Sequence, residues 1–223
     1  LDVSYSHFDA KFRCTTGYQC VGIDPPLPEE AEDDGDLVQA SFATRFSDIL
    51  FINAFLGAAR QEGFSNNELV SPVGGGSFDL YIAPQLGFGF GASYEALFDT
   101  AQIIDNHIRL TTVTGRIDYQ FAQRWRLRGS AQHGWFSDGN QRNVLNWALS
   151  VRLPVRRPRL SITYFGRYLS YKDDDQQELA SGYFAPTSFF SNLLTVGVGD
   201  NLFHRRFYYS VEVTGGIQEF NRL

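Results

Sequence analysis

The chain has 223 residues, of which 43% are hydrophobic and 15% aromatic, which is enough apolar surface for one domain with a sizeable core. It contains no run of about 18 apolar residues, which excludes a helical membrane span and, within these residues, an N-terminal signal peptide. A formal charge of −6, without a basic stripe bearing interleaved aromatics, argues against nucleic acid as a partner. The chain is therefore either soluble or crosses a membrane as β-strands.

The N-terminal segment combines an alternating strand pattern with a loop that carries both cysteines. Residues 1–12 are predicted to form a strand, and the chain starts within that pattern without a Met anywhere, which predicts a mature fragment of a longer protein. The loop 13–36 follows, with three prolines and an acidic run. Cys14 and Cys20 are close enough for a disulfide, which requires an oxidising compartment. Two free thiols are the alternative, and the spacing does not match a complete zinc site.

The next strands are joined by short turns and one loop. Residues 37–46 and 49–60 alternate, and the two-residue turn at 47–48 favours a strand over a short helix for the second segment. A loop with Pro72 and three glycines is predicted over 61–77. Strands at 78–83 and 86–95 then flank Pro84.

Glycine recurs on one face of the strand predicted at 86–95. Gly87, Gly89 and Gly91 share that face, which fits a wall beside an open space or a plug better than a packed sandwich. A phosphate-binding loop is not supported, because neither a helix signal nor a Lys-Ser/Thr pair follows these glycines.

The stretch 105–138 gives the clearest pattern, a hairpin with one apolar and one charged face. Val113, Ile117 and Tyr119 alternate with Arg116 and Asp118, and the same alternation restarts after a turn at 122–124. Further strands are predicted at 144–153, 159–172, 191–199 and 203–220. The fold class that follows is all-β, with about eleven antiparallel strands in successive hairpins.

Loop lengths distinguish a soluble sandwich from a transmembrane barrel. The predicted loops 13–36, 61–77, 96–105, 137–141 and 173–187 fall on one side, and the turns at 47–48, 84–85, 122–124, 154–158 and 200–202 fall on the other. Long loops outside and short turns in the periplasm are typical of an up-and-down outer-membrane barrel. Because an odd number of strands does not close an ordinary bacterial barrel, at least one further strand is expected, so residues 1–223 form part of a larger barrel.

The polar faces of the strands supply the candidate functional residues. These side chains are expected to line a hydrated lumen and to guide a polar passenger, or else to pair across strands and brace the wall. They are Arg116, Asp118, Arg126, Arg128, Arg152, Arg167 and Glu212. No nucleophile, base or carboxylate pair stands at a spacing that indicates catalysis, and neither a metal nor a cofactor is expected.

From about Tyr94 onward, the chain resembles the C-terminal barrels of tetratricopeptide-repeat outer-membrane proteins, the group that contains the cellulose and poly-N-acetylglucosamine export subunits. The segments that carry the likeness are 95–101 with 108–110, Arg124-Trp-Arg-Leu, 168–175 and 183–189, where two aromatics, Pro186 and Phe189 precede a strand. The resemblance implies a periplasmic helical-repeat region upstream and export of an exopolysaccharide. No repeat helices are present in this sequence, a departure from the family pattern.

The leading hypothesis is a non-enzymatic outer-membrane channel of a Gram-negative bacterium that exports a polar polymer such as an exopolysaccharide. Its expected partners are outer-membrane lipid and lipopolysaccharide, a polysaccharide passenger, and a periplasmic or barrel-plugging protein. Two alternatives stay open from the sequence. One is a scaffold barrel that encloses or docks a partner protein, and the other is a secreted soluble β-sandwich that binds ligands through its loops.

Overall fold

Eleven β-strands account for most of the computed structural model, which describes residues 2–13, 30–62, 68–98, 103–104, 106–155, 157–173, 186–202 and 207–221. The strands are β1 (Asp2–Arg13), β2 (Glu30–Ser47), β3 (Leu50–Glu62), β4 (Glu68–Ala83), β5 (Leu86–Ala96), β6 (Arg109–Ala122), β7 (Trp125–Phe136), β8 (Gln141–Arg152), β9 (Arg159–Tyr171), β10 (Ser188–Leu202) and β11 (Phe207–Asn221). Among the described residues, no helix is long and apolar enough to cross a membrane. Cys14 and Cys20 lie outside these residues.

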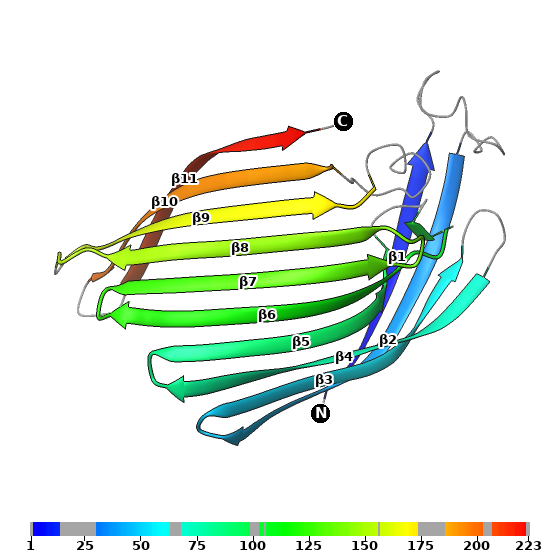
Figure 1. Cartoon of the computed structure of the whole chain (residues 1–223), viewed down its shortest axis with the longest axis horizontal. Helices are drawn as coiled ribbons and strands as arrows, with labels where there is room; N and C mark the ends of the chain where they lie inside the picture. The colour runs from blue at the N-terminus through cyan, green and yellow to red at the C-terminus, as the bar shows by residue number, and fades with distance from the viewer. Residues whose placement is uncertain are drawn as a thin grey trace.

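The strands form one curved sheet in which sequence neighbours are also spatial neighbours (Figure 1). Every adjacent pair from β1 to β11 is antiparallel. Strands β1 and β11 stand at the two ends of this order, and no pairing joins them in the part of the chain that the structure describes. The predicted eleven-strand, up-and-down arrangement is therefore confirmed, including the strand at β3.

As predicted, the short turns lie at one end of the sheet and the long connections belong to the other, although their residue bounds differ from the prediction. Two-residue turns join β2 to β3, β4 to β5 and β6 to β7, and they lie at the left in Figure 1. The connections after β1, β5 and β9 are much longer and belong to the opposite end. The turn predicted at 200–202 is wrong, because β10 continues to Leu202 and pairs with β11 over that length.

Two segments predicted as loop belong to strands. Residues 30–36 extend β2 and pair with β1, and residues 68–77 extend β4 and pair with β3. Backbone pairing does not require apolar side chains, so acidic residues continue a strand that reaches water. Pro72 lies where β4 pairs with β3 alone, since pairing with β5 begins at Gly74. A proline without an N–H is tolerated on such a one-sided stretch. The three consecutive glycines are part of this paired strand as well.

The register assigns opposite chemistry to the two faces of the sheet. One face carries almost all of the exposed large apolar residues of the strands, among them Phe42, Leu56, Phe78, Leu145 and Val213. Tyr81, Tyr208 and Phe220 are the exceptions, on the other face. A soluble protein rarely exposes contiguous apolar patches above a few hundred Å². The sheet thus separates a polar face from an apolar face, and the apolar face is exposed.

The polar face is the concave one, because the connection between β5 and β6 folds across it. Leu97 O accepts a 2.7 Å hydrogen bond from Gln61 Nε2 of β3. Phe98 lies against Gly35 of β2, where a Cβ would come within 2.4 Å of the ring. One strand separates β3 from β5 and two separate β2 from it. Because Gly35 and Gln61 share the face of Asp79 by register, the connection contacts the inside of the curved sheet.

An apolar cluster forms where this connection meets the concave face, at the end that carries the longest connections. Ile103 and Ile104 have no exposed surface, and Ile103 packs with residues of β6, β7, β8 and β9. The other members of this inner cluster are Ile108, Leu110, Phe136, Val144, Leu169 and Tyr171. Asn140 is fully buried and links the two connections at this end, since its Oδ1 accepts a hydrogen bond from Asp173 N at 3.1 Å. The hydrophobic core of the described chain therefore lies within the curve of the sheet.

Candidate functional site

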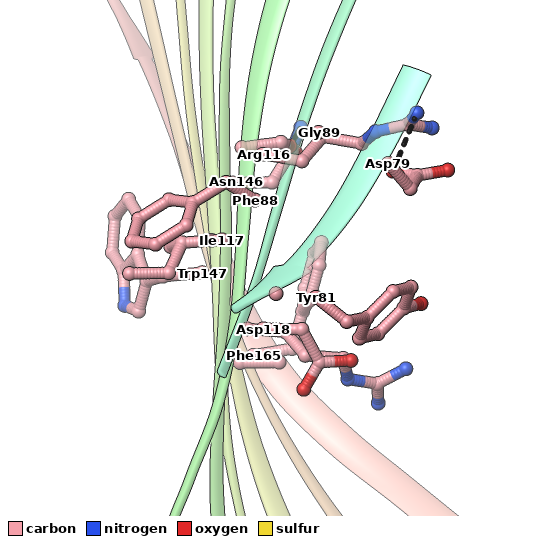
Figure 2. Close-up of a pocket in the computed structure, with 15 residues that line it drawn as sticks. Asp79, Tyr81, Phe88, Gly89, Arg116, Ile117, Asp118, Asn146, Trp147 and Phe165 are labelled. Carbon is pink, nitrogen blue, oxygen red and sulfur yellow. Dashed lines mark hydrogen bonds and ion pairs between the residues drawn. The ribbon is translucent and has the colours of Figure 1, made fainter. Parts of the chain in front are cut away.

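One groove of the concave face lies over β4 to β9 and has a volume of about 410 Å³. Its lining combines charged groups, an amide, hydroxyls and four aromatic residues. Figure 2 shows Asp79, Tyr81 and Asp118 on one side of the strands, with Ile117 and Trp147 on the opposite side. The groove therefore opens to the concave side, and Ile117 and Trp147 point away from it.

Glycine in β5 lets side chains from two other strands meet above it. Asp79 of β4, Gly89 and Arg116 of β6 stand in one register row. Arg116 Nη2 donates to Asp79 Oδ1 at 3.0 Å across the glycine (Figure 2). A Cβ at Gly89 would lie 2.3 Å from Asp79 Oδ1 and 2.7 Å from Arg116 Nε. In the next row, the Tyr81 ring covers Gly87 in the same way. The glycine face predicted to border an open space is thus covered by an ion pair and a ring.

A second ion pair braces the neighbouring strands. Arg126 of β7 binds Asp118 of β6 through two hydrogen bonds, of which the one from Nε to Oδ1 measures 2.7 Å. Both side chains keep substantial exposure to the groove. Exposed pairs of this kind contribute about 0.2–1 kcal/mol each, so they orient the wall more than they stabilise it.

Four further arginines of this face have no carboxylate partner within the described part of the chain. They are Arg128, Arg152, Arg159 and Arg167. Arg142 differs from them, because it contacts Gln132 and lies over the Phe136 ring. Glu212 of β11 also has no cationic partner among these residues.

All seven candidate residues from the sequence share the concave face by register, as the alternation predicted. Arg116, Asp118 and Arg128 line the groove, and Arg126 joins it through Asp118. Arg152, Arg167 and Glu212 lie on β8, β9 and β11, outside the groove's immediate lining. Asp79 and Tyr81 are the groove residues that sequence reasoning missed. The sequence pattern could have predicted them, because both stand on the polar positions of β4 opposite glycines.

The imidazoles and carboxylates of the described residues do not form a metal site. No group of three His, Cys, Asp or Glu side chains that could hold a metal occurs among them. His133 lies on the outward face, where it contacts Asn143 Oδ1 and the Trp135 ring. What the concave face offers chemically is a row of charges and hydrogen-bonding groups along a solvent-filled groove.

Replacing Gly89 with valine is expected to break the Asp79–Arg116 ion pair, because the added Cβ occupies the space between the two groups. Overpacking of this kind costs about 1–3 kcal/mol. Equilibrium unfolding of the folded protein in urea would measure that loss. Gly215→Val is the matched control, since nothing lies within 4 Å of a Cβ at Gly215. Equal stability of the two variants would show that Gly89 is not required for this contact.

Comparison with solved structures identifies a structural neighbour. A solved structure described as "Bacterial polysaccharide outer membrane secretin" aligns with 99% of this chain and 86% of its own chain, with a TM-score of 0.56 and 13% sequence identity. The chain has the fold of that structure. No protein-family model matches the chain, and no curated protein matches it either.

The match confirms the predicted fold class, an all-β antiparallel sheet of the outer-membrane barrel type. The sequence resemblance to outer-membrane export barrels agrees with it at the level of the fold. The soluble β-sandwich alternative is wrong, because a sandwich packs the apolar faces of two sheets together. Here the described strands belong to a single sheet whose apolar face is exposed.

Proposed function

We propose that this chain forms the wall of an outer-membrane channel that exports a polar polymer, an exopolysaccharide, without catalysing a reaction. The observation that carries the proposal is the inverted distribution of side chains, with apolar residues outward and charged residues on the concave face. The fold shared with a polysaccharide outer-membrane secretin supports the polymer as passenger.

The outward face fits a lipid environment in detail. Besides aliphatic residues it carries aromatics near strand ends, such as Trp125, Trp135 and Phe207. Such aromatics are characteristic of the girdles at membrane interfaces. Tyr164 lies in mid-strand on the same face. Its hydroxyl donates to Asn192 Oδ1 on the same face, which satisfies both groups away from water.

Closure of the wall is part of the proposal. Among the described residues, no strand pairs with the outer edges of β1 and β11, and hydrocarbon does not tolerate unpaired backbone N–H and C=O groups at such edges. Further strands, from the same polypeptide or from a partner, would pair with both edges. Detection of the native polypeptide in separated membranes tests this. A species well above 25.2 kDa in the outer membrane is expected if the same polypeptide supplies the strands and a periplasmic repeat region.

A scaffold barrel that docks a partner protein is less well supported. That function requires an apolar or bare glycine surface inside the wall. The glycine positions of β5 are instead covered by the Asp79–Arg116 pair and by Tyr81. The apolar inner cluster is already filled by the chain's own residues 103 and 108.

Export is tested in cells that synthesise an exopolysaccharide and depend on the full-length protein to release it. Deletion is expected to retain the polymer in the periplasm, and re-expression is expected to restore release. Purified protein in planar bilayers should also conduct ions. Normal release without the protein, together with silent bilayers, would contradict the channel. Recovery of the protein in the soluble fraction would contradict the membrane location itself.

A further inference from the structure

The concave face is more basic than the chain as a whole. On strands β3 to β11 this face carries seven arginines and four carboxylates, by the register of the sheet. The arginines are Arg116, Arg126, Arg128, Arg142, Arg152, Arg159 and Arg167, and the carboxylates are Asp79, Glu95, Asp118 and Glu212. The full chain, in contrast, has a formal charge of −6. The excess of positive charge is therefore confined to one surface.

Ion pairing leaves more arginines than carboxylates without a partner on this face. Asp79 and Asp118, the two carboxylates nearest the groove, are neutralised by Arg116 and Arg126. The four arginines without a carboxylate partner, the arginine ladder, are Arg128, Arg152, Arg159 and Arg167. All four are exposed, and all lie on the three adjacent strands β7, β8 and β9. A cation that is neither buried nor paired on such a wall is available to a passenger.

The ladder follows the direction of the strands. Arg159 stands near the short turns, and Arg152 is in the next register row, opposite Ser161. Arg128 shares a row with Ala148 and Phe165, and Arg167 is one row further on, opposite Asn146. The single row between Arg152 and Arg128 contains Arg126. Five successive rows thus each carry an arginine, over roughly 27 Å from Arg159 to Arg167. Because strands of outer-membrane barrels are tilted by about 35–45°, that length spans roughly two thirds of a hydrocarbon thickness of about 30 Å.

We propose that the arginine ladder selects an anionic polysaccharide, one that bears carboxylate or similar groups along its length, as the exported polymer. This inference rests on the proposed channel function and adds the charge class of its substrate. Guanidinium groups present a planar fork of donors that matches a carboxylate. Positively charged rows in pores favour anions, and several weak sites in series allow a passenger to move from one to the next.

The experiment measures block of the conducting channel by three oligosaccharides of equal length in planar bilayers. The probes are oligogalacturonate, a neutral malto-oligosaccharide and a cationic chitosan oligomer. At low salt, half-block by oligogalacturonate is expected at about tenfold lower concentration than by the neutral oligomer, which corresponds to 1.4 kcal/mol. The preference should fall steeply in 1 M salt, where the Debye length is about 3 Å.

Charge-removing variants assign the preference to the ladder. The double variant Arg128→Gln/Arg167→Gln is expected to lose most of the preference for oligogalacturonate over the neutral oligomer. Arg60→Gln, which removes an arginine from the outward face near Glu68, is the matched control and should keep the preference. Three results would overturn the inference but not the proposed channel function. They are equal block by all three oligomers, stronger block by the chitosan oligomer, and a double variant that keeps the preference for oligogalacturonate. A channel that never opens would overturn the proposed function and the inference with it.

Discussion

Replacing Leu194 with arginine is expected to destabilise the protein in lipid by about 2–4 kcal/mol, the cost of a lipid-facing arginine near the membrane midplane. Leu194 lies near the middle of β10 on the outward face, with half of its surface exposed. In lipid that surface contacts hydrocarbon, which cannot solvate a guanidinium group. Urea unfolding of the protein in phospholipid vesicles measures the effect.

The neighbouring residue provides the matched control. Thr195 is on the concave face, where its hydroxyl contacts Thr214 Oγ1 at 2.8 Å. Thr195→Arg adds the same group on the same strand but directs it toward water, so a much smaller loss is expected. Similar losses for the two variants would contradict the assignment of faces. Tolerance of arginine at both positions would indicate that the outward face does not contact lipid.

The division between the two faces was predictable because it depends only on local alternation. A period of two along each strand assigns Val113 and Arg116 to opposite faces whatever their partners are. For the same reason, all seven charged candidates share one face by register, whereas their lining of a lumen stays a prediction. Their roles were not predictable, because an ion pair such as Asp79–Arg116 joins residues 37 positions apart in the sequence. Only the register of three strands and the absence of a side chain at Gly89 bring them together.

Strand ends were predicted less well, since proline, glycine and acidic residues were interpreted as loop. Pro72 and Gly74 are within β4, and Asp36 is within β2, because strands pair through their backbone whatever side chains they carry. The sequence also contains an indication of the inner cluster, which the strand alternation alone does not reveal. Leu110 and Phe136 are apolar residues on the polar face, and both stand at the same end of the sheet.

Substituting alanine for Ile103 is expected to loosen the connection that crosses the concave face. Ile103 has no exposed surface and belongs to the inner cluster, so its truncation removes about 2–5 kcal/mol of packing. The backbone of the connection depends on that packing. Ile108 N donates to Ile103 O at 3.0 Å, and Leu97 N donates to Ile108 O at 3.1 Å. Both amides are expected to exchange hydrogen at least about thirtyfold faster, the factor that 2 kcal/mol gives.

Leu145→Ala is the control for this variant, because Leu145 follows Val144 of the inner cluster but is nearly half exposed on the outward face. Its truncation should leave exchange at Leu97 and Ile108 unchanged. Because the connection occupies the concave face, its release in Ile103→Ala should also raise single-channel conductance in planar bilayers. Faster exchange without higher conductance would show that the connection covers the wall without narrowing the path. Unchanged exchange would show that Ile103 does not hold the connection in place.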